Sequence, residues 1–238
     1  MSDFLLMLPT LNEEEALKAL GPEIPTWMDV LVVDGGSTDR TKDIAESLGY
    51  AFLVQEFGRG KGCGVRTGMK YFLSHGYRYL GMIDTDYTCV PSELERMLAA
   101  MQSDGFDLVL GARDRAKQRE LLGRFSLFIN SSTSGLTSFA YKMSLPDIQT
   151  GYWLFSRRAV EALYPRLVAS GFEIEYDMVF NSWREGLRMG SVPVTIRSRL
   201  GETKFTNYLR LKQIYHGLRY VNKSLYIMLT GKRSNGRH

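Results

Sequence analysis

The sequence has little cysteine, no long apolar run and no internal repeat. Its 238 residues include only Cys63 and Cys89, too few for a disulfide scaffold, so a reducing compartment is favoured over a secreted one. Because no stretch of about 18 apolar residues is uninterrupted, a membrane span is not expected. Asp3 stands where a signal peptide would carry basic residues, and the short apolar run after it is interpreted as a core strand.

Apolar residues make up 44% of the chain, enough to bury a substantial core. We expect one domain over residues 1–205 and a basic helical extension over residues 206–238. From 197 to 237 the chain has ten Lys or Arg residues and one acidic residue, Glu202. This imbalance favours an anionic partner such as phospholipid headgroups, phosphates or nucleic acid.

Short apolar runs alternate with longer helical patterns in the first half of the chain. The expected strands are residues 4–8, 30–33, 51–54, 80–83 and 108–110, and the expected helices are residues 12–20, 38–48, 61–73 and 91–101. This alternation predicts an α/β fold with a mainly parallel sheet flanked by helices. Ligands bind beyond the carboxyl ends of such strands, so the polar clusters after them are the candidate site.

The segment Asp84-Thr85-Asp86 places two carboxylates directly after the apolar run 79–83. Mg²⁺ and Mn²⁺ prefer oxygen ligands and are often held by one or two carboxylates together with substrate phosphates. Aspartate is also common in turns, so the triplet alone is compatible with ordinary loop chemistry. Similar polar clusters after the neighbouring strands favour the metal-site interpretation.

Polar clusters also follow the first two expected strands, at residues 9–14 and 34–39. Asn12 with Glu15, and Ser37 or Thr38, are equally compatible with helix N-caps. Four such clusters along one edge of a sheet are harder to explain by capping alone.

The glycine-rich segment 58–64 matches neither G-x-G-x-x-G nor the P-loop, because Gly62 follows Lys61. A NAD enzyme or a P-loop kinase is therefore disfavoured. What remains is a flexible basic loop with Arg59, Lys61 and Arg66, suited to steering or clamping a diphosphate.

Taken in order, these segments resemble glycosyltransferase family 2, in particular its dolichyl-phosphate mannosyltransferase and glucosyltransferase-like branch. The resemblance covers roughly residues 3–205. It depends on the segments LPTLNEEE, VVDGGSTDRT, GRGKGCGVRTGM, IDTDYTCVPSEL, DLVLGARDR, DIQTGYWLFSRRAV, GFEIEYDM and PVTIRSRLGETKF. Leu11 and Gly35 replace a tyrosine and an aspartate of the family pattern, which leaves the donor base open between uracil and guanine.

The resemblance implies a GT-A fold, with a nucleotide-sugar-binding half and an acceptor-binding half, and a Mg²⁺ or Mn²⁺ cofactor. It implies three groups of donor-site residues: Pro9, Glu13 and Asp34 around the base and ribose, Lys61 and Arg66 near the nucleotide, and Asp84 and Asp86 at the ribose, metal and diphosphate. The metal ligands predicted in this way are Asp84 and Asp86.

Transfer with inversion needs stabilisation of the departing nucleoside diphosphate, which a metal and basic side chains supply. A hydroxyl acceptor also needs a general base, whereas a phosphate monoester is already anionic and needs cations to place it. Residues 147–150 offer no Glu-Asp pair at the expected base position, although Asp147 is a fallback base. The predicted catalytic residues are Asp86, Arg113, Arg199 and Lys204, with Arg197 adding positive charge. This set favours a polyprenyl phosphate acceptor.

Between residues 208 and 229 apolar positions recur every three or four residues, with Lys and Arg largely between them. This pattern predicts an amphipathic basic helix, either packed on the protein's own core or lying among lipid headgroups. We expect a peripheral protein on the cytoplasmic face of a membrane, either a short form of its family or one that works with a separate membrane-spanning partner. Residues 125–143 form either a second wall of a lipid groove or an ordinary packed helix.

Three other functions stay open at this point. The chain could be a family 2 transferase for a soluble or polysaccharide hydroxyl, or a non-catalytic basic module that binds membrane or nucleic acid. The pair Asp84 and Asp86 argues against the second, so nucleic acid is not expected as a partner. A sugar nucleotidyltransferase would need a glycine-rich, arginine-bearing loop after the first strand, and residues 9–15 contain none.

Overall fold

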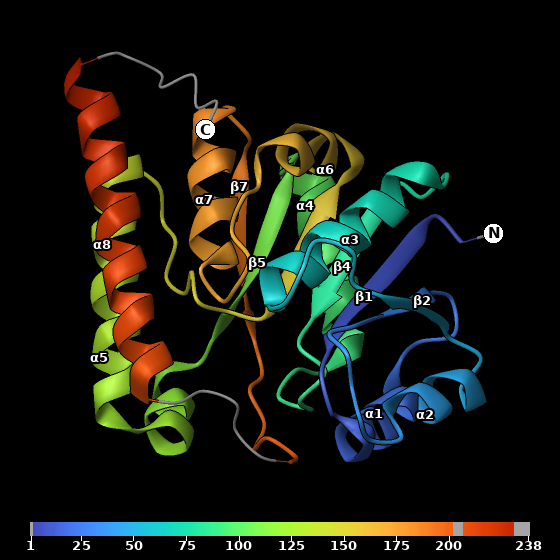
Figure 1. The fold of residues 1–238 in the computed structure, drawn as a ribbon. Helices are drawn as coiled ribbons and strands as arrows, with labels where there is room; N and C mark the ends of the chain where they lie inside the picture. The colour runs from blue at the N-terminus through green and yellow to red at the C-terminus, as the bar shows by residue number, and fades with distance from the viewer. Residues whose placement is uncertain (1, 202–206, 231–238) are drawn as a thin grey trace.

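The computed structural model of the chain describes residues 2–201 and 207–230. Its centre is a seven-stranded sheet in the order β3-β2-β1-β4-β6-β5-β7 (Figure 1). β6 runs antiparallel to its neighbours β4 and β5, and the other pairs are parallel. The strands are β1 (Phe4–Thr10), β2 (Asp29–Asp34), β3 (Ala51–Val54), β4 (Tyr79–Ile83), β5 (Leu108–Arg113), β6 (Tyr152–Ser156) and β7 (Met189–Val194).

Helices cover both faces of the sheet. The α-helices are α1 (Glu14–Leu20), α2 (Thr41–Ser47), α3 (Lys61–Ser74), α4 (Leu94–Asp104), α5 (Arg115–Tyr141), α6 (Arg157–Leu163), α7 (Ile174–Arg184) and α8 (Asn207–Thr230). Short 3₁₀ helices are η1 (Gly21–Glu23), η2 (Pro91–Glu93) and η3 (Tyr164–Arg166). One apolar cluster joins the sheet to α3, α6 and α7, and a second joins its other face to α1, α2 and α4. The predicted α/β fold with a mainly parallel, helix-flanked sheet is confirmed.

The central strands are apolar on both faces because helices bury both. Every residue of β1 except Pro9 is buried, and β4 is buried from Leu80 onward. Such continuous apolar runs are typical of parallel strands inside α/β proteins. Because every strand except β6 runs in the same direction, the carboxyl ends of these six strands meet at one edge of the sheet.

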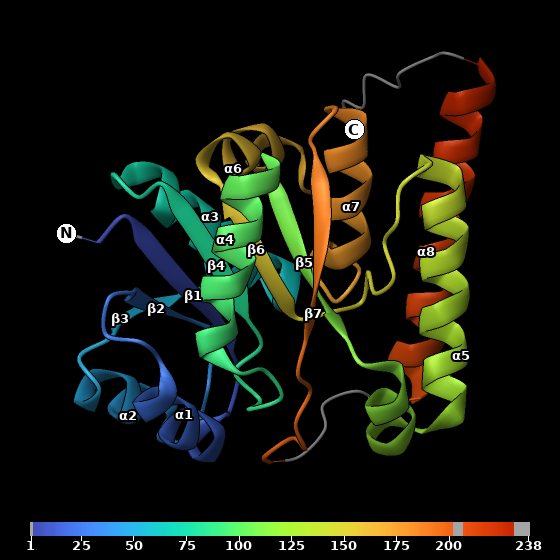
Figure 2. The same cartoon turned by 180° about the vertical axis from the view of Figure 1, so that it is seen from behind.

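α5 and α8 lie side by side at one flank, beyond α7 (Figures 1 and 2). α8 faces the protein through Gly217, Val221 and Ser224, which are buried, and the Tyr141 hydroxyl lies 2.7 Å from Ser224 Oγ. Within residues 2–201 and 207–230, no helix combines the length and the apolar content that crossing a bilayer requires. The predicted domain boundary at residue 205 lies outside the described residues and stays a prediction.

Candidate active site

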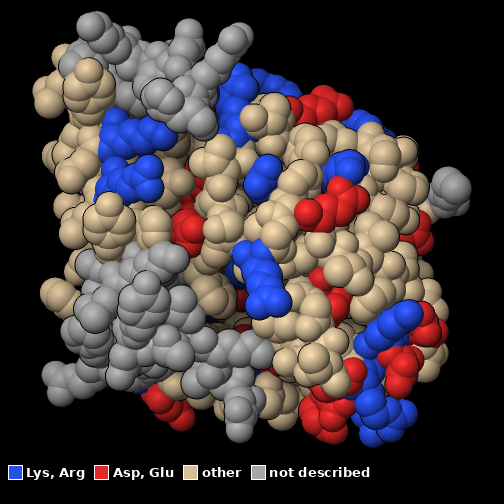
Figure 3. Space-filling model, viewed as in Figure 1, with Lys and Arg blue, Asp and Glu red and all other residues tan. Residues whose placement is uncertain are grey.

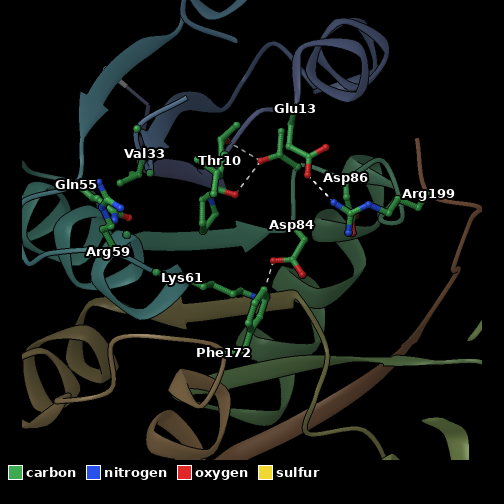
Figure 4. A pocket seen from close by; sticks show the side chains of 17 residues that line it. Thr10, Glu13, Val33, Gln55, Arg59, Lys61, Asp84, Asp86, Phe172 and Arg199 are labelled. Carbon is green, nitrogen blue, oxygen red and sulfur yellow. Dashed lines mark hydrogen bonds and ion pairs between the residues drawn. The ribbon is translucent and has the colours of Figure 1, made fainter. Parts of the chain in front are cut away.

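A pocket of about 570 Å³ opens at the carboxyl edge of the sheet. Its walls come from the ends of β1 and β2, the β3–α3 connection, the loop after β4, Phe172 before α7, and Arg199 after β7. Gln55 and Arg59 lie at one end of the pocket, and Asp86 and Arg199 lie at the other (Figure 4). Ligand sites in open α/β sheets lie at this edge.

Lys61 lies under the pocket between two carboxylates. Its Nζ is 2.7 Å from Asp84 Oδ1 and 2.8 Å from Glu175 Oε1. Burial alone would lower the pKa of Lys61, but the charges of Asp84 and Glu175 outweigh burial and raise it. Lys61 therefore stays protonated and neutralises the charge beneath the pocket.

The glycines around Lys61 allow close packing. A Cβ at Gly60 would lie 2.5 Å from Ser170 O, and a Cβ at Gly62 would lie 2.3 Å from Ala169 O. The expected flexible loop is thus wrong for this part of the segment, because α3 begins at Lys61 and packs directly on the chain at 169–171.

The Asp84-Thr85-Asp86 turn is tied to the neighbouring strand. The buried Thr85 hydroxyl donates to Pro9 O at 3.1 Å and lies 2.8 Å from Thr10 Oγ1. Asp84 N donates to Gly151 O at 3.1 Å. These contacts fix both carboxylates toward the pocket without using their oxygens.

Arg199 bridges two carboxylates across the charged end of the pocket. Its Nη1 lies 3.1 Å from Asp86 Oδ2, and its Nη2 lies 2.6 Å from Glu13 Oε1 (Figure 4). The other oxygen of Asp86, Oδ1, accepts hydrogen bonds from the backbone and side chain of Thr88. Arg199 thus holds the position beside Asp86 where another cation would also be favoured.

The residues present fit a divalent cation that takes part of its coordination from substrate. Within the described part of the chain, no group of three or more His, Cys, Asp or Glu side chains forms a complete metal site. Mg²⁺ and Mn²⁺ are commonly bound through one or two carboxylates plus phosphate oxygens and water, which is the donor set that Asp84 and Asp86 offer. The ion-paired groups described above are two cations and four carboxylates, namely Lys61, Arg199, Glu13, Asp84, Asp86 and Glu175. This excess of negative charge is suited to a cation.

Sequence reasoning missed Glu175. Burial raises its pKa to about 7, and Lys61 offsets this only in part. Its Oε2 atom is buried and has no hydrogen-bond partner among the described residues. The available signal was a pair of carboxylates, Glu175 and Asp177, among the apolar residues of the first turns of α7.

The pocket brings together six of the predicted site residues: Pro9, Glu13, Lys61, Asp84, Asp86 and Arg199. Three others do not line it. Asp34 accepts hydrogen bonds from Gly36 and Ser37 in its own turn, and the Arg66 guanidinium lies 4.4 Å from the centre of the Phe57 ring.

Arg113, the third, makes a buried ion pair with Asp147. Its Nε lies 2.6 Å from Asp147 Oδ2, and its Nη2 donates to Gln149 O. Burial would raise the pKa of Asp147, but the Arg113 charge and hydrogen bonds outweigh it and lower that pKa. Lys204 lies outside the described residues, and the role of each residue stays a prediction.

Asn12 links two of the loops at this edge instead of capping α1. Its N–H donates to Ser37 Oγ at 2.7 Å, and its Oδ1 accepts from Thr38 N at 2.7 Å. The helix-cap alternative for Asn12 is therefore wrong, because the N-cap of α1 is Glu13.

An α/β sheet with a charged pocket at its carboxyl edge is the arrangement of ligand-binding open α/β proteins. Residues 6–164 match the sequence model of Glycosyl transferase family 2, and the chain belongs to this family. Among curated proteins it is 30% identical over 196 residues to Glycosyltransferase AglJ of Haloferax volcanii, covering 82% of this chain and 63% of that protein.

The names of two further relatives specify a polyprenol or an undecaprenyl phosphate. The chain is 30% identical over 215 residues to undecaprenyl-phosphate mannosyltransferase of Micrococcus luteus, covering 85% of this chain and 87% of the relative. It is 28% identical over 215 residues to polyprenol monophosphomannose synthase of Mycolicibacterium smegmatis, covering 85% and 80%.

Solved structures support the fold. Glucosyl-3-phosphoglycerate synthase of Mycobacterium tuberculosis, crystallised with phosphoglyceric acid, superposes with a TM-score of 0.73 at 16% identity, covering 92% of this chain and 80% of that one. The same enzyme in complex with Mn²⁺, uridine diphosphate and glucosyl-3-phosphoglycerate gives a TM-score of 0.66 at 19% identity, covering 98% and 81%. The predicted GT-A fold is confirmed.

Proposed function

We propose that the chain is an inverting hexosyltransferase that moves a sugar from a nucleoside diphosphate sugar to a polyprenyl phosphate at a membrane surface. The observation that carries the proposal is the pocket itself, where Lys61, Asp84, Asp86 and Arg199 gather at the carboxyl edge of the sheet. Family membership supplies the reaction class, and the two mannosyltransferase relatives support the acceptor class.

The two ends of the pocket suit the two ends of a sugar nucleotide. Val33, Gly35 and Gln55 offer a mostly uncharged surface for a base and ribose, with Pro9 and the charged Arg59 close by. Glu13 lies toward the other end, paired with Arg199. The opposite end carries the ion pairs and suits a diphosphate. Asp34 and Arg66 do not line the pocket and would act on the nucleotide indirectly.

Asp84 and Asp86 would hold Mg²⁺ or Mn²⁺ together with the donor diphosphate. When bound, the cation would stabilise the charge that develops on the departing nucleoside diphosphate. Lys61 adds a fixed positive charge beneath the same place, and its two carboxylate partners keep it oriented. A preorganised positive charge is an effective way to stabilise a leaving group.

Two cationic side chains would bind an anionic acceptor: Arg199 at the pocket, and Lys204, for which the sequence predicts a catalytic role. Arg113 is better suited to a positioning role, because its guanidinium is already bound by Asp147. The same ion pair makes Asp147 a poor general base, since a carboxylate with a lowered pKa accepts protons weakly. A phosphate acceptor, which needs no strong base, agrees with this arrangement.

The flank formed by α5 and α8 supports a membrane surface as the place of reaction. Phe128 and Phe139 of α5 are 68% and 82% exposed, and Leu229 of α8 is 86% exposed. α8 has no acidic residue, and basic side chains gather over it in Figure 3. An exposed apolar stripe flanked by basic residues is typical of helices that lie in the headgroup region. We place the protein on the cytoplasmic face of the membrane as part of this proposal.

A donor screen tests the proposal. UDP- and GDP-sugars, each with and without Mn²⁺, are expected to raise the melting temperature for one nucleotide only when Mn²⁺ is present. The shift should disappear in Asp86→Ala and persist in Asp43→Ala, which removes an exposed carboxylate on α2. A shift that is independent of metal would contradict the proposed role of Asp86.

The acceptor is tested by following the transfer of labelled sugar to three molecules. A short polyprenyl phosphate should be labelled, whereas the matching polyprenol and 3-phosphoglycerate should not. Labelling of 3-phosphoglycerate would instead favour a small phosphorylated acceptor. Labelling of the polyprenol would favour a hydroxyl acceptor.

A further inference from the structure

The segment that carries Arg199 is pinned along the Asp86–Thr88 loop. We call residues 195–200, between β7 and Gly201, the strap. Arg197 N donates to Thr88 O at 3.0 Å, and Leu200 N donates to Asp86 O at 3.1 Å. The strap backbone is thus fixed beside Asp86, and the Arg199 side chain reaches over the carboxylate from it.

The two strap arginines differ in their surroundings. The Arg197 guanidinium is paired with Glu23, donates to two backbone carbonyl groups and lies 3.8 Å from the centre of the Tyr87 ring. Arg199 makes its two ion pairs with Asp86 and Glu13, and its Nε is buried without a hydrogen-bond partner among the described residues. Arg199 is therefore held by charges at the pocket, whereas Arg197 is held by contacts away from it.

We propose that Arg199 is a displaceable counter-ion of Asp86, and that a divalent cation binding at Asp86 releases it. This inference depends on the proposed metal-dependent transfer. One carboxylate oxygen of Asp86 is committed to Thr88 and the other to Arg199. A metal that takes the second oxygen must compete with the guanidinium for it.

The release has a consequence for the acceptor. While Arg199 bridges Asp86 and Glu13, both of its terminal nitrogens are occupied by protein carboxylates. Once displaced, they can bind an anionic acceptor with charge-assisted hydrogen bonds. Metal and donor therefore bind before the acceptor, and Arg199 is a positioning residue in the first step and an acceptor ligand in the second.

The test uses Mn²⁺ alone, with free Mn²⁺ measured by electron paramagnetic resonance. Removal of a competing cation should strengthen binding, so Arg199→Gln is expected to bind Mn²⁺ about tenfold more tightly than the unchanged protein, within the usual range of coupling between two sites. Arg197→Gln is the matched control, because it removes a charge from the same strap but not from Asp86. Its Mn²⁺ affinity should change by less than about twofold, since the Arg197 charge is already paired with Glu23 and not with Asp86.

A second readout needs no variant. In the unchanged protein labelled with ¹⁵N-arginine, Mg²⁺ should shift the Arg199 side-chain signal and leave that of Arg197 in place. An unchanged Arg199 signal at saturating Mg²⁺, or an Arg199→Gln affinity equal to or weaker than that of the unchanged protein, overturns the inference while leaving the proposed transfer intact. Failure to bind Mn²⁺ even with UDP or GDP present overturns both.

Discussion

Gly151→Ala is expected to displace Asp84 from the pocket while leaving the fold in place. Gly151 directly precedes β6, and a Cβ at this position would lie 2.0 Å from Asp84 Oδ2 and 2.3 Å from Asp84 Cγ. Non-bonded heavy atoms do not approach this closely, and optimal contacts are about 3.5–4.0 Å. Because Gly151 does not have a positive φ, alanine introduces a clash with Asp84 and no backbone strain.

The expected losses of stability and of Mn²⁺ affinity depend on which atoms must move. The obstructed group is the end of a side chain, so the clash itself costs the fold about 1 kcal/mol, at the low end for overpacking, and the loss of the Asp84 charge beside buried Lys61 adds to this cost. The same rotation separates Asp84 from Lys61, whose Nζ now lies 2.7 Å from Oδ1. Misplacing a group that supports a metal site typically costs 10–100-fold in metal affinity, and we expect a loss of about that size for Mn²⁺ with nucleotide.

Isothermal titration with Mn²⁺ and nucleotide measures the affinity, and urea unfolding measures the stability. Gly135→Ala is the control, because a Cβ at Gly135 in α5 meets no atom within 4 Å. It should leave affinity unchanged and raise the free energy of unfolding by about 0.5–1 kcal/mol, as expected for alanine in a helix interior. A folded Gly151→Ala protein with undiminished affinity would refute the role assigned to Asp84.

Two further predictions concern a buried charge and the helical flank. Because burial raises the pKa of Glu175 from 4.5 to about 7, its contribution to stability is present at low pH and is lost as the pH rises through 7. The free energy of unfolding of the unchanged protein relative to Glu175→Gln should therefore fall between pH 4.5 and 8, by up to about 3 kcal/mol; a difference constant with pH would contradict this. Phe128→Ser with Phe139→Ser should weaken flotation with vesicles containing anionic lipid, whereas Val54→Ser, at an exposed position on β3, should not. Flotation of the Phe128→Ser, Phe139→Ser protein equal to that of the Val54→Ser protein would argue that this flank does not face lipid.

The sheet and one end of the pocket could be predicted because local pattern determines them. The apolar runs at 4–8, 30–33, 51–54, 80–83 and 108–110 each became a strand. Burial on both faces demands continuous apolar sequence in the central strands, whereas β3 at the sheet edge leaves Ala51 and Val54 exposed. The Asp84-Thr85-Asp86 turn follows from the position of its strand, since the carboxyl edge of a parallel sheet gathers such turns.

The ion pairs could not be predicted because they join residues distant in sequence. Lys61 and Glu175 are separated by 114 positions, and Asp86 and Arg199 by 113. No local pattern specifies that Lys61 would be buried between two carboxylates or that Arg113 would be bound by Asp147. Charges of this kind depend on packing between elements, and their burial is tolerated because each finds a partner.

The orientation of α8 also depends on packing. The sequence predicted an amphipathic basic helix and left open whether its apolar side faces the core. The structure places Gly217, Val221 and Ser224 inward, whereas the larger Leu218 and Leu225 are exposed. Small residues lie inward because Tyr176 approaches closely, such that a Cβ at Gly217 would lie 3.1 Å from its hydroxyl oxygen.

The charged end of the pocket is already paired within the protein, so a ligand must exchange partners there and cannot simply add to the site. Lys61 is paired with Asp84 and Glu175, and Arg199 is paired with Asp86 and Glu13. A divalent cation that takes over the carboxylates frees positive groups for the diphosphate and for the acceptor. Binding free energies linked in this way are reciprocal, so a nucleotide that strengthens Mn²⁺ binding must itself bind more tightly by the same factor when Mn²⁺ is present. A nucleotide that leaves the Mn²⁺ affinity unchanged would show that the pocket does not work by this exchange.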